Sequence, residues 1–372
     1  MNYNHKHSTY IWERSDWHDF QWDSNKLMEP LARLSQLHGL LIGRMTMLGF
    51  NDKSRSMLSS MTNELISSSE IEGISLNPQS VRSSIAQRLG IADDGMLVED
   101  HYVEGLVDVM IDAVQNCHER LTDERLFGWH AALFPTGRSG IHKITVADWR
   151  KGDEPMQVVS GALGHEKIHY IAPPSSNVPY EMAQLIEFCN KSNLSPFILA
   201  GIAHLWFVTI HPFDDGNGRL SRTLSDMFLA RLEPNSSRYY SMSAEINRNK
   251  NSYYNILELS QKGNMDITQW LLWFFDCLEK SIKRSLALID NTLAKSVYWD
   301  KFRDVEINER QRKIINQLWD GFEGKLTSSK WAKICSCSQD TAIRDIKDLL
   351  SKGMLLDSGE GGRSTNYILP HE

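Results

Sequence analysis

The chain has 372 residues, 41% of them hydrophobic, which is enough to form two or three domains with buried cores and excludes a disordered or fibrous protein. Its formal net charge of -7 gives no overall field that would attract a nucleic-acid backbone, although a small basic patch can still exist. The five cysteines are scattered and contain no CxxC pair, which excludes a disulfide framework and a zinc site and favours a cytoplasmic location.

No segment has the pattern of a signal peptide or a membrane span. The first residues, "MNYNHKHSTYIWERSDW", lack an apolar core. The apolar stretch "GLLIGRMTMLGF" is interrupted by Arg44, and "QWLLWFF" is too short to cross a bilayer. We therefore expect no membrane partner.

The first third of the chain is predicted to be helical. Apolar residues recur every three or four positions in "SNKLMEPLARLSQLHGLLIGRMTML", "SRSMLSSMTNELISS", "VEGLVDVMIDAVQNC" and "DERLFGWHAALF". Thr122 or Asp123 is suited to cap the last of these helices. We assign residues 1–95 to an N-terminal helical region.

The pattern changes near residue 140. Between Arg150 and Pro174, two short β-prone runs, Gln157 to Val159 and Ile168 to Ile171, flank a glycine-containing connection and predict a β-hairpin. Helical spacing resumes near Tyr180 and continues to about Asp300. We assign residues 96–300 to a second domain, so the fold class is mainly α with one β-hairpin.

The last segment, residues 305–372, is predicted to contain three short helices and a glycine-rich turn between two extended pieces. This order resembles a winged helix-turn-helix, with a third helix that begins near Ser338 and "GEGGRSTN" as the wing. Residues 305–372 hold ten Lys or Arg and ten Asp or Glu, so attraction to phosphates would be weak. Protein docking or homodimer formation is at least as well supported as DNA binding.

The densest group of reactive side chains is "HPFDDGNGRLSR", His211 to Arg222. Pro212 must end the preceding helix, and the glycines at 216 and 218 allow backbone N–H groups to approach an anion. A helix that starts there adds the positive end of its dipole, and Arg219 and Arg222 share one of its faces. The segment therefore predicts a phosphate site.

Two further side chains of this segment fit phosphate chemistry. Asp215 offers a hard oxygen of the kind that Mg²⁺ takes from proteins, and His211 can remove a proton from a hydroxyl. Each residue also has a structural reading: His211 as a core histidine, Asp214 as a solvated or capping acid and Phe213 as a hydrophobic anchor. His204 and His211, with Asp215, would alternatively form a transition-metal site.

The same segment matches the Fic family signature His-Pro-Phe-x-Asp/Glu-Gly-Asn-Gly-Arg-x-x-Arg at every specified position. The chain therefore resembles the Fic family, whose members are helical, carry a β-hairpin flap over the site, and mostly transfer AMP from ATP to a Ser, Thr or Tyr hydroxyl of a protein. "DWRKGDEPMQVVSG" followed by "YIAPPSSNVPYEM" resembles the flap region, so the likeness covers roughly residues 100–276.

The resemblance implies a role for each residue of the motif. His211 would be the base, Asp215 would hold Mg²⁺, Arg219 would reach the β-phosphate and Arg222 the γ-phosphate of ATP. The remaining site residues that it implies are the phosphate cradle Gly216, Asn217 and Gly218, the flap Gln157, Val158, Val159 and Ser160, which would pair with an extended target segment, and the adenine-side Tyr253 and Tyr254. Ordinary helix packing is an equally supported reading of the two tyrosines.

The segment "SSSEIEG" resembles the inhibitory motif of the family, Ser/Thr-x-x-x-Glu-Gly/Asn. It places Ser68, Glu72 and Gly73 at the end of a helix of about residues 54–73, and the family pairs this glutamate with the second arginine of the signature, here Arg222. Gly73 is equally explained as an ordinary helix stop. The resemblance implies an autoinhibited enzyme that also modifies itself when released.

Two other functions stay open at this stage. Relatives in the family move UMP, phosphocholine or phosphate, or remove AMP. A regulator that senses a nucleotide and acts through residues 305–372 is the second alternative.

Overall fold

The computed structural model describes residues 9–91, 100–160, 167–233, 237–359 and 365–370. The chain divides into two compact units, residues 1–287 and residues 288–372. The predicted domain boundaries near residues 95 and 300 remain predictions. No helix in the described residues is long and apolar enough to cross a membrane.

The first unit is mainly helical, which confirms the predicted fold class. Its α-helices, the last of which continues into the second unit, are α1 (Ser24–Met47), α2 (Phe50–Ile71), α3 (Pro78–Leu89), α4 (His101–Gln115), α5 (Asp123–Leu133), α6 (Val178–Lys191), α7 (Pro196–Ile210), α8 (Asn217–Ala230), α9 (Met242–Arg248), α10 (Lys250–Lys262) and α11 (Thr268–Lys301). Two 3₁₀ turns accompany them, η1 (Ile11–Glu13) and η2 (Ser175–Asn177).

Side-chain caps fix several helix starts. The carboxylate of Asp23 accepts from the backbone N–H groups of Asn25 and Lys26 at the start of α1. At α5 the cap is Thr122, whose hydroxyl accepts from Arg125 N at 3.1 Å, so of the two predicted candidates the threonine caps the helix. Each cap satisfies a backbone donor that has no partner inside its helix.

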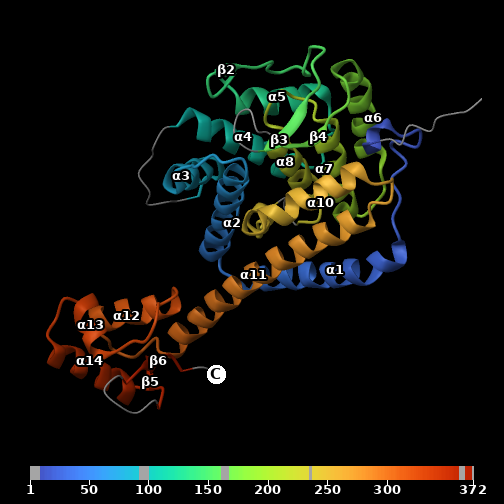
Figure 1. The fold of residues 1–372 in the computed structure, drawn as a ribbon. Coiled ribbons are helices and arrows are strands. Elements are labelled where there is room, and N and C mark those ends of the chain that lie inside the picture. Colours follow the sequence, from blue (N-terminus) through green and yellow to red (C-terminus); the bar gives the residue numbers. More distant parts are fainter. Residues whose placement is uncertain (1–8, 92–99, 161–166, 234–236, 360–364, 371–372) are drawn as a thin grey trace, which may run out of the picture. The chain divides into compact units, whose positions relative to one another are not determined.

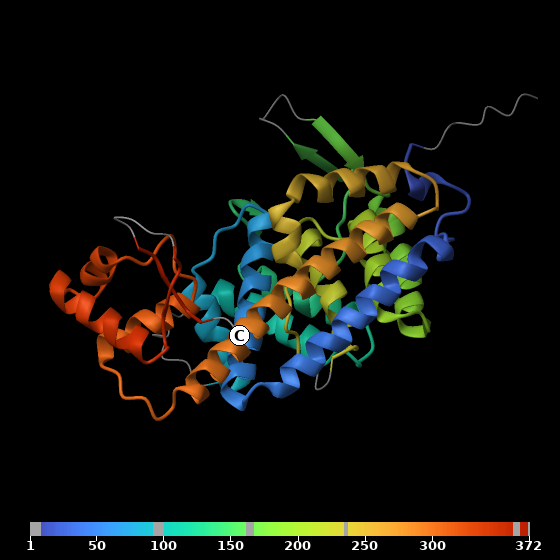
Figure 2. The ribbon, with the colours of Figure 1, turned by 90° about the horizontal axis from the view of Figure 1, so that it is seen from below.

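Helices α7 and α8 form the centre of this unit. Nearly all of α7 is apolar and buried, including Phe207 and Ile210, as expected for a helix surrounded by others. It packs against α8 and α6, and α4 covers α8. Helices α1 and α11 run side by side (Figures 1 and 2), joined by an Arg33–Glu279 ion pair of 2.7 Å.

The predicted β-hairpin is confirmed. Strand β3 (Gln157–Ser160) pairs antiparallel with β4 (Lys167–Ile171), with a bulge between Val158 and Val159, and Figure 2 shows the two strands projecting beyond α10. The connection between them, residues 161–166, lies outside the described residues. A second hairpin, β1 (Arg138–Ser139) with β2 (His142–Lys143), was not predicted, because strands of two residues show no alternation.

The second unit contains the three predicted short helices, α12 (Glu309–Trp319), α13 (Ser328–Ile334) and α14 (Gln339–Ser351), followed by the antiparallel pair β5 (Leu356–Asp357) and β6 (Tyr367–Ile368). Their core contains Ile314, Trp331 and Leu349. Helix α14 begins directly after Ser338, its N-cap, which agrees with the predicted helix start near Ser338. Most of the predicted wing, residues 360–364, lies outside the described residues, and the winged-helix and DNA-binding assignments remain predictions.

Candidate active site

His211 stands where α7 ends. Pro212 has no N–H to continue the helix, and His211 itself adopts a left-handed conformation with φ 53°. Its backbone N–H still bonds to Phe207 O at 3.0 Å. The side chain is therefore presented from the rigid end of a buried helix.

The hydrogen bond of His211 fixes its tautomer. Nδ1 lies 3.2 Å from the carbonyl oxygen of Val208, which can only accept, so Nδ1 carries the proton and Nε2 holds the lone pair. Burial lowers the pKa of His211 to about 4. The Val208 carbonyl and the carboxylates of Glu72 and Asp215 oppose this shift, whereas Arg150 adds to it. The ring is neutral at pH 7 and can act as a base.

The loop after His211 is closed by Asn217. Its side-chain oxygen accepts from Phe213 N at 3.0 Å, and its amide donates to Phe213 O at 2.8 Å. Gly216 has φ 85°, and a Cβ there would lie 2.9 Å from the ring of Phe134, so only glycine fits. The asparagine side chain shapes the loop, which leaves backbone N–H groups as donors at the start of α8.

Phe213 anchors the loop, as the structural reading predicted. The side chain is fully buried, and its ring stacks on His130 with centroids 4.1 Å apart. His130 is also fully buried, and its Nε2 lies 3.2 Å from the backbone oxygen of Asp215. Helix α5 thus supports the loop through the contacts of His130.

The two acids of the motif differ in their contacts. Asp214 accepts from the backbone N–H of Thr145 at 2.7 Å, in the segment that follows β2, so this hydrogen bond holds a loop and is not a helix cap. Asp215 accepts from Ser139 and, at 2.5 Å, from Gly216 N, and its side chain is 44% exposed. Only Asp215 offers a carboxylate to a ligand beside the loop.

Asp215 is the one motif carboxylate suited to Mg²⁺, but the described residues contain no group of three or more His, Cys, Asp or Glu that would hold a metal. Mg²⁺ commonly binds through one or two carboxylates plus phosphate oxygens and water, so Asp215 fits that pattern. The alternative transition-metal site is not formed: His204 is fully buried and its ring nitrogens bond to Ser225 and Tyr253 at 2.9 and 2.8 Å.

Both arginines of the motif are buried on α8. Arg219 donates to the hydroxyl of Tyr102 at 2.7 Å, and its guanidinium lies 4.9 Å from the ring centroid of Phe134. Arg219 Nε and Arg222 Nη1 are buried and have no hydrogen-bond partner among the described residues. Each is a donor that a phosphate oxygen would satisfy.

Arg222 contacts the end of α2. Its Nη2 lies 2.7 Å from Glu72 Oε1 and 2.9 Å from Ser68 O, and its Nε lies 2.9 Å from Ser68 Oγ. Gly73 follows with φ 78° and ends the helix. The structure therefore brings together the three residues of the predicted inhibitory motif and Arg222.

Comparison with known proteins identifies the family. Residues 120–229, which contain the whole loop and the start of α8, match the family model described as Fic/DOC family. The chain therefore contains a Fic domain. Residues 10–91, which contain α2, match a model described as a domain of unknown function (DUF4172).

Curated relatives share only part of the sequence. The protein adenylyltransferase Fic of Drosophila yakuba is 37% identical over 93 residues, which are 25% of this chain and 17% of the fly protein. The corresponding protein of Drosophila willistoni is 31% identical over 116 residues, 30% of this chain and 22% of that protein. The matched part thus spans about a fifth of the length of these relatives.

Solved structures show the same fold. A Fic family protein from Desulfovibrio desulfuricans G20 has a TM-score of 0.55 and 16% identity, over 95% of this chain and 98% of that chain. A Fic domain containing signaling protein from Bacteroides thetaiotaomicron has a TM-score of 0.52 and 20% identity, over 69% and 95%.

The two tyrosines predicted on the adenine side of the Fic site differ in exposure. Tyr253 is buried, and its hydroxyl bonds to His204. Tyr254 is 40% exposed, and its hydroxyl donates to Ile71 O at 3.3 Å, one residue before Glu72. Tyr253 fits the helix-packing reading, and of the two tyrosines only Tyr254 presents a ring toward solvent, beside the predicted inhibitory residues.

Strand β3 of the predicted flap has one unpaired edge. In the described residues β3 pairs only with β4, so its other edge has unpaired backbone groups. Val159 is 47% exposed, whereas Val158 packs with Met156 against a small core of Tyr10 and Tyr170. Gln157 and Ser160 are the first and last residues of the strand.

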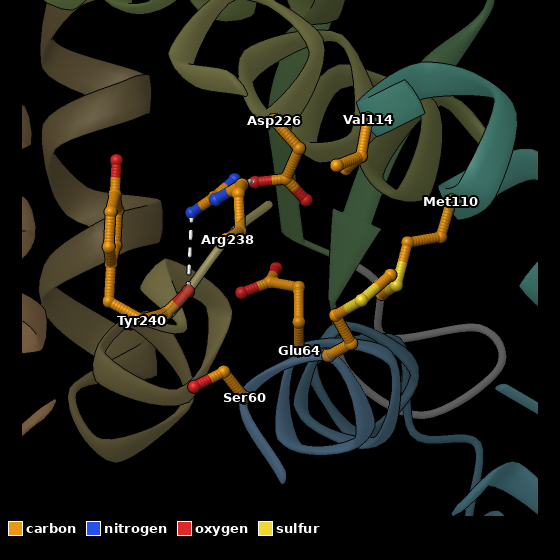
Figure 3. A pocket seen from close by; sticks show the side chains of 8 residues that line it. Ser60, Glu64, Met110, Val114, Asp226, Arg238 and Tyr240 are labelled. Atoms are coloured by element: carbon orange, nitrogen blue, oxygen red, sulfur yellow. Dashed lines mark hydrogen bonds and ion pairs between the residues drawn. The ribbon is translucent and has the colours of Figure 1, made fainter. Parts of the chain in front are cut away.

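A second polar cluster of the Fic protein lies between α2 and α8. The side chains of Glu64, Asp226 and Arg238 line one small cavity (Figure 3). The volume of this cavity is about 10 Å³. Arg238 pairs with Asp226, and Glu64 accepts from Ser241 Oγ at 2.8 Å and from Ser243 N at 3.0 Å. Glu64 therefore holds α2 to the N-terminus of α9.

Sequence reasoning missed several supports of the Fic site: Tyr102, His130, Ser139 and Arg150. Arg150 lies in "DWRKG", which was predicted only to be part of the flap region. A basic residue beside the aromatic Trp149 was the available signal. The other three gave no signal, because their partners in the motif are 76 or more residues away in sequence.

Proposed function

We propose that this Fic protein transfers AMP from ATP to a Ser, Thr or Tyr hydroxyl of a protein, and that Glu72 restrains the transfer. One observation carries the proposal: a histidine with its lone pair on Nε2 stands six residues before the first residue of an α-helix that carries two buried arginines. A base and a polyphosphate site on one short loop suit attack by a hydroxyl on a nucleotide phosphate.

The start of α8 would bind the phosphates. Backbone N–H groups of Asn217 and Gly218 have no partner within their helix, and the helix dipole favours negative charge there. Arg219 Nε would donate to the β-phosphate, and Arg222 Nη1 to the γ-phosphate. These contacts would align the α-phosphate with His211.

In the transfer step, the target hydroxyl oxygen bonds to the α-phosphorus while His211 Nε2 takes the hydroxyl proton. The bond from the α-phosphorus to the oxygen that bridges it to the β-phosphate breaks, and pyrophosphate leaves. AMP is then joined to the target oxygen. His211 and the cradle contribute mainly positioning and charge stabilisation.

Asp215 is the residue that would hold Mg²⁺. Bound there, Mg²⁺ would neutralise charge on the phosphates. The carboxylate is exposed on one side, and its hydrogen bonds to Ser139 and Gly216 N orient it without an ion pair closer than 3.8 Å, the distance from its Oδ1 to Arg219 Nη2.

Glu72 would restrain transfer by competing with the γ-phosphate for Arg222. A carboxylate bound to a guanidinium is about twice as strong a partner as a neutral group. With the γ-phosphate displaced, the α-phosphate would be misaligned, and about 1 Å of misplacement costs around a hundredfold in rate. ATP binding would survive better than transfer.

The free edge of β3 would receive an extended segment of the target. Backbone pairing fixes the register of such a segment and makes few demands on its sequence. The exposed Val159 would contact an apolar side chain of the target. Self-modification would use the same edge.

The test is incubation of Glu72→Gly with α-labelled ATP and cell lysate, followed by mass spectrometry of the labelled proteins. His211→Ala combined with Glu72→Gly is the control and should lose transfer by on the order of 10² to 10⁴ while it still binds ATP. Competition by other unlabelled nucleotides reports the group moved. Labelling that persists at full rate in the control would remove His211 from the reaction.

A further inference from the structure

Arg150 is a buried arginine whose side chain donates hydrogen bonds to backbone carbonyl oxygens. It is 4% exposed, and its Nε donates to His211 O at 2.7 Å. Its Nη2 donates to Pro173 O and, at 3.4 Å, to Ile210 O. Its own backbone N–H donates to Pro212 O at 2.8 Å. One side chain thus joins the end of α7, the first residues of the motif and the segment that leaves β4.

Burial of the Arg150 guanidinium in this arrangement costs free energy. A buried cation without a carboxylate partner loses hydration that no opposite charge replaces. Within the described residues, Arg150 forms hydrogen bonds to backbone oxygens but no ion pair. Part of the cost is offset because Ile210 O and His211 O lie at the C-terminal end of α7, where the dipole favours positive charge. Burial nevertheless lowers the pKa of Arg150.

We propose that Arg150 is a positioning residue for His211, and that it ties this residue to the base of the flap. His211 has a left-handed φ of 53°, a conformation that non-glycine residues adopt only when surrounding contacts hold them. The planar guanidinium supplies such contacts on the carbonyls of residues 210 and 211. The proposal rests on the proposed function, in which His211 is the base.

The link to the flap is doubled by Tyr170 of β4. Its buried hydroxyl donates to Thr209 O at 2.6 Å, and Thr209 directly precedes Ile210 and His211, whose carbonyls contact Arg150. The strand that pairs with β3 is therefore fastened to the end of α7 at Thr209 and, through Pro173, at His211. These contacts would hold a target segment on β3 in a fixed position relative to His211, the base that deprotonates it.

Arg150 also acts on His211 through its charge. The charged groups that face the imidazole are Arg150 from the segment before β3, Glu72 from the end of α2 and Asp215 from the motif loop. Arg150 is the cation among them. Removal of its charge should raise the pKa of His211, whereas removal of its planar fork alone should not.

Two substitutions separate geometry from charge. Arg150→Lys keeps the charge and loses the fork, and Arg150→Met loses both. The matched control is Arg231→Lys: Arg231 donates to the backbone oxygen of Cys117 at 2.8 Å, away from the site, and burial likewise lowers its pKa. Thermal unfolding first establishes that each variant is folded.

Three quantities are then measured: the His211 pKa by NMR of histidine-labelled protein without ATP, ATP affinity by calorimetry, and AMP transfer in the Glu72→Gly background. We expect Arg150→Lys to lose transfer about ten- to a hundredfold with unchanged ATP affinity and His211 pKa. Arg150→Met should lose at least as much and raise the His211 pKa. Arg231→Lys should change none of the three.

Transfer by Arg150→Lys at the rate of the Arg231→Lys control would overturn the positioning role. An unmoved His211 pKa in Arg150→Met would overturn the charge contact. The NMR measurement needs no transfer, so failure of the proposed function, seen as transfer without His211, is distinguishable from failure of this inference. If Arg150→Met does not fold, Arg150→Lys alone decides the positioning role.

Discussion

The carboxylate of Glu72 lies directly over Gly218, so closely that a Cβ at position 218 would come within 2.2 Å of Glu72 Oε1. The Glu72 carboxylate thus lies against the first turn of α8, where a phosphate would approach the backbone. It also lies 2.7 Å from Arg222. In our proposal one acidic side chain covers both the backbone cradle and the arginine that ATP needs.

Ser68→Ala should release the enzyme less than Glu72→Gly. Ser68 contributes its hydroxyl to Arg222 Nε at 2.9 Å, but its backbone oxygen remains as a partner after the substitution. Loss of one hydrogen bond to a charged group is worth about 1.5–3 kcal/mol before compensation. A severalfold rise in labelled AMP transfer is expected. A rise as large as that of Glu72→Gly would show that Glu72 alone is not the restraint.

Asp215→Asn should weaken the dependence of ATP binding on Mg²⁺. The amide keeps the size of the side chain and its place beside Ser139 but removes the negative charge that would attract the cation. Calorimetry of ATP with and without Mg²⁺ should show a marked difference for the wild type and little for Asp215→Asn. Asp214→Asn, whose carboxylate accepts from Thr145 N, is the control and should keep the difference.

Glu64→Gln should loosen α2 and raise basal transfer without a change in the phosphate site. Glu64, Ser68 and Glu72 follow one another at intervals of four on the same helix, so all three share one face. Glu64 places a carboxylate at the N-terminus of α9, where a cap is worth about 0.5–2 kcal/mol.

Hydrogen exchange of the α2 amides is the direct readout for Glu64→Gln and should increase. The matched control is Glu70→Gln on the same helix, because Glu70 is exposed and accepts from Asn247 at 2.7 Å. Equal exchange and equal transfer in the two variants would contradict an anchoring role for Glu64.

Stability should fall as the pH drops below about 6.5, because the buried His130 and His204 and the partly buried His211 resist protonation. Burial lowers the pKa of His130 and His211 to about 4 and that of His204 to about 3. In the unfolded chain the pKa of histidine is near 6.5, so below that pH the unfolded chain binds protons that the folded chain does not bind. The loss of stability runs from about pH 6.5 down to the folded values.

Calorimetric Tm should therefore decrease by roughly 10 °C between pH 7 and pH 5. His142→Gln, at an exposed position on β2, should leave the slope unchanged. A Tm that is flat over this range would mean that the three rings are protonated in the folded protein.

Much of the fold could be predicted because its signals are local. The helical spacing of apolar residues and the β-prone runs depend on neighbours in sequence, and so does the break at Pro212. The β1–β2 hairpin was missed because two-residue strands carry no periodic signal, although it places Ser139 against Asp215.

The site was predictable where its residues are adjacent in sequence and not where they converge from afar. His211 to Arg222 is one continuous loop and helix start. Arg150 and Tyr102 reach it across 61 and 117 residues, and the position of Arg150 beside Trp149, the one local signal, does not identify a partner. Glu72 was predicted only through its resemblance to a known motif, since 150 residues separate it from Arg222.

The most direct test of the central claim is the initial rate of AMP transfer from α-labelled ATP by Glu72→Gly relative to wild type, over a range of ATP and Mg²⁺ concentrations. The account predicts a rise well above tenfold, self-modification included, and no rise for Arg222→Ala, which loses the restraint and the phosphate contact together. A folded Glu72→Gly protein that transfers AMP no faster than wild type at any of these concentrations would contradict it.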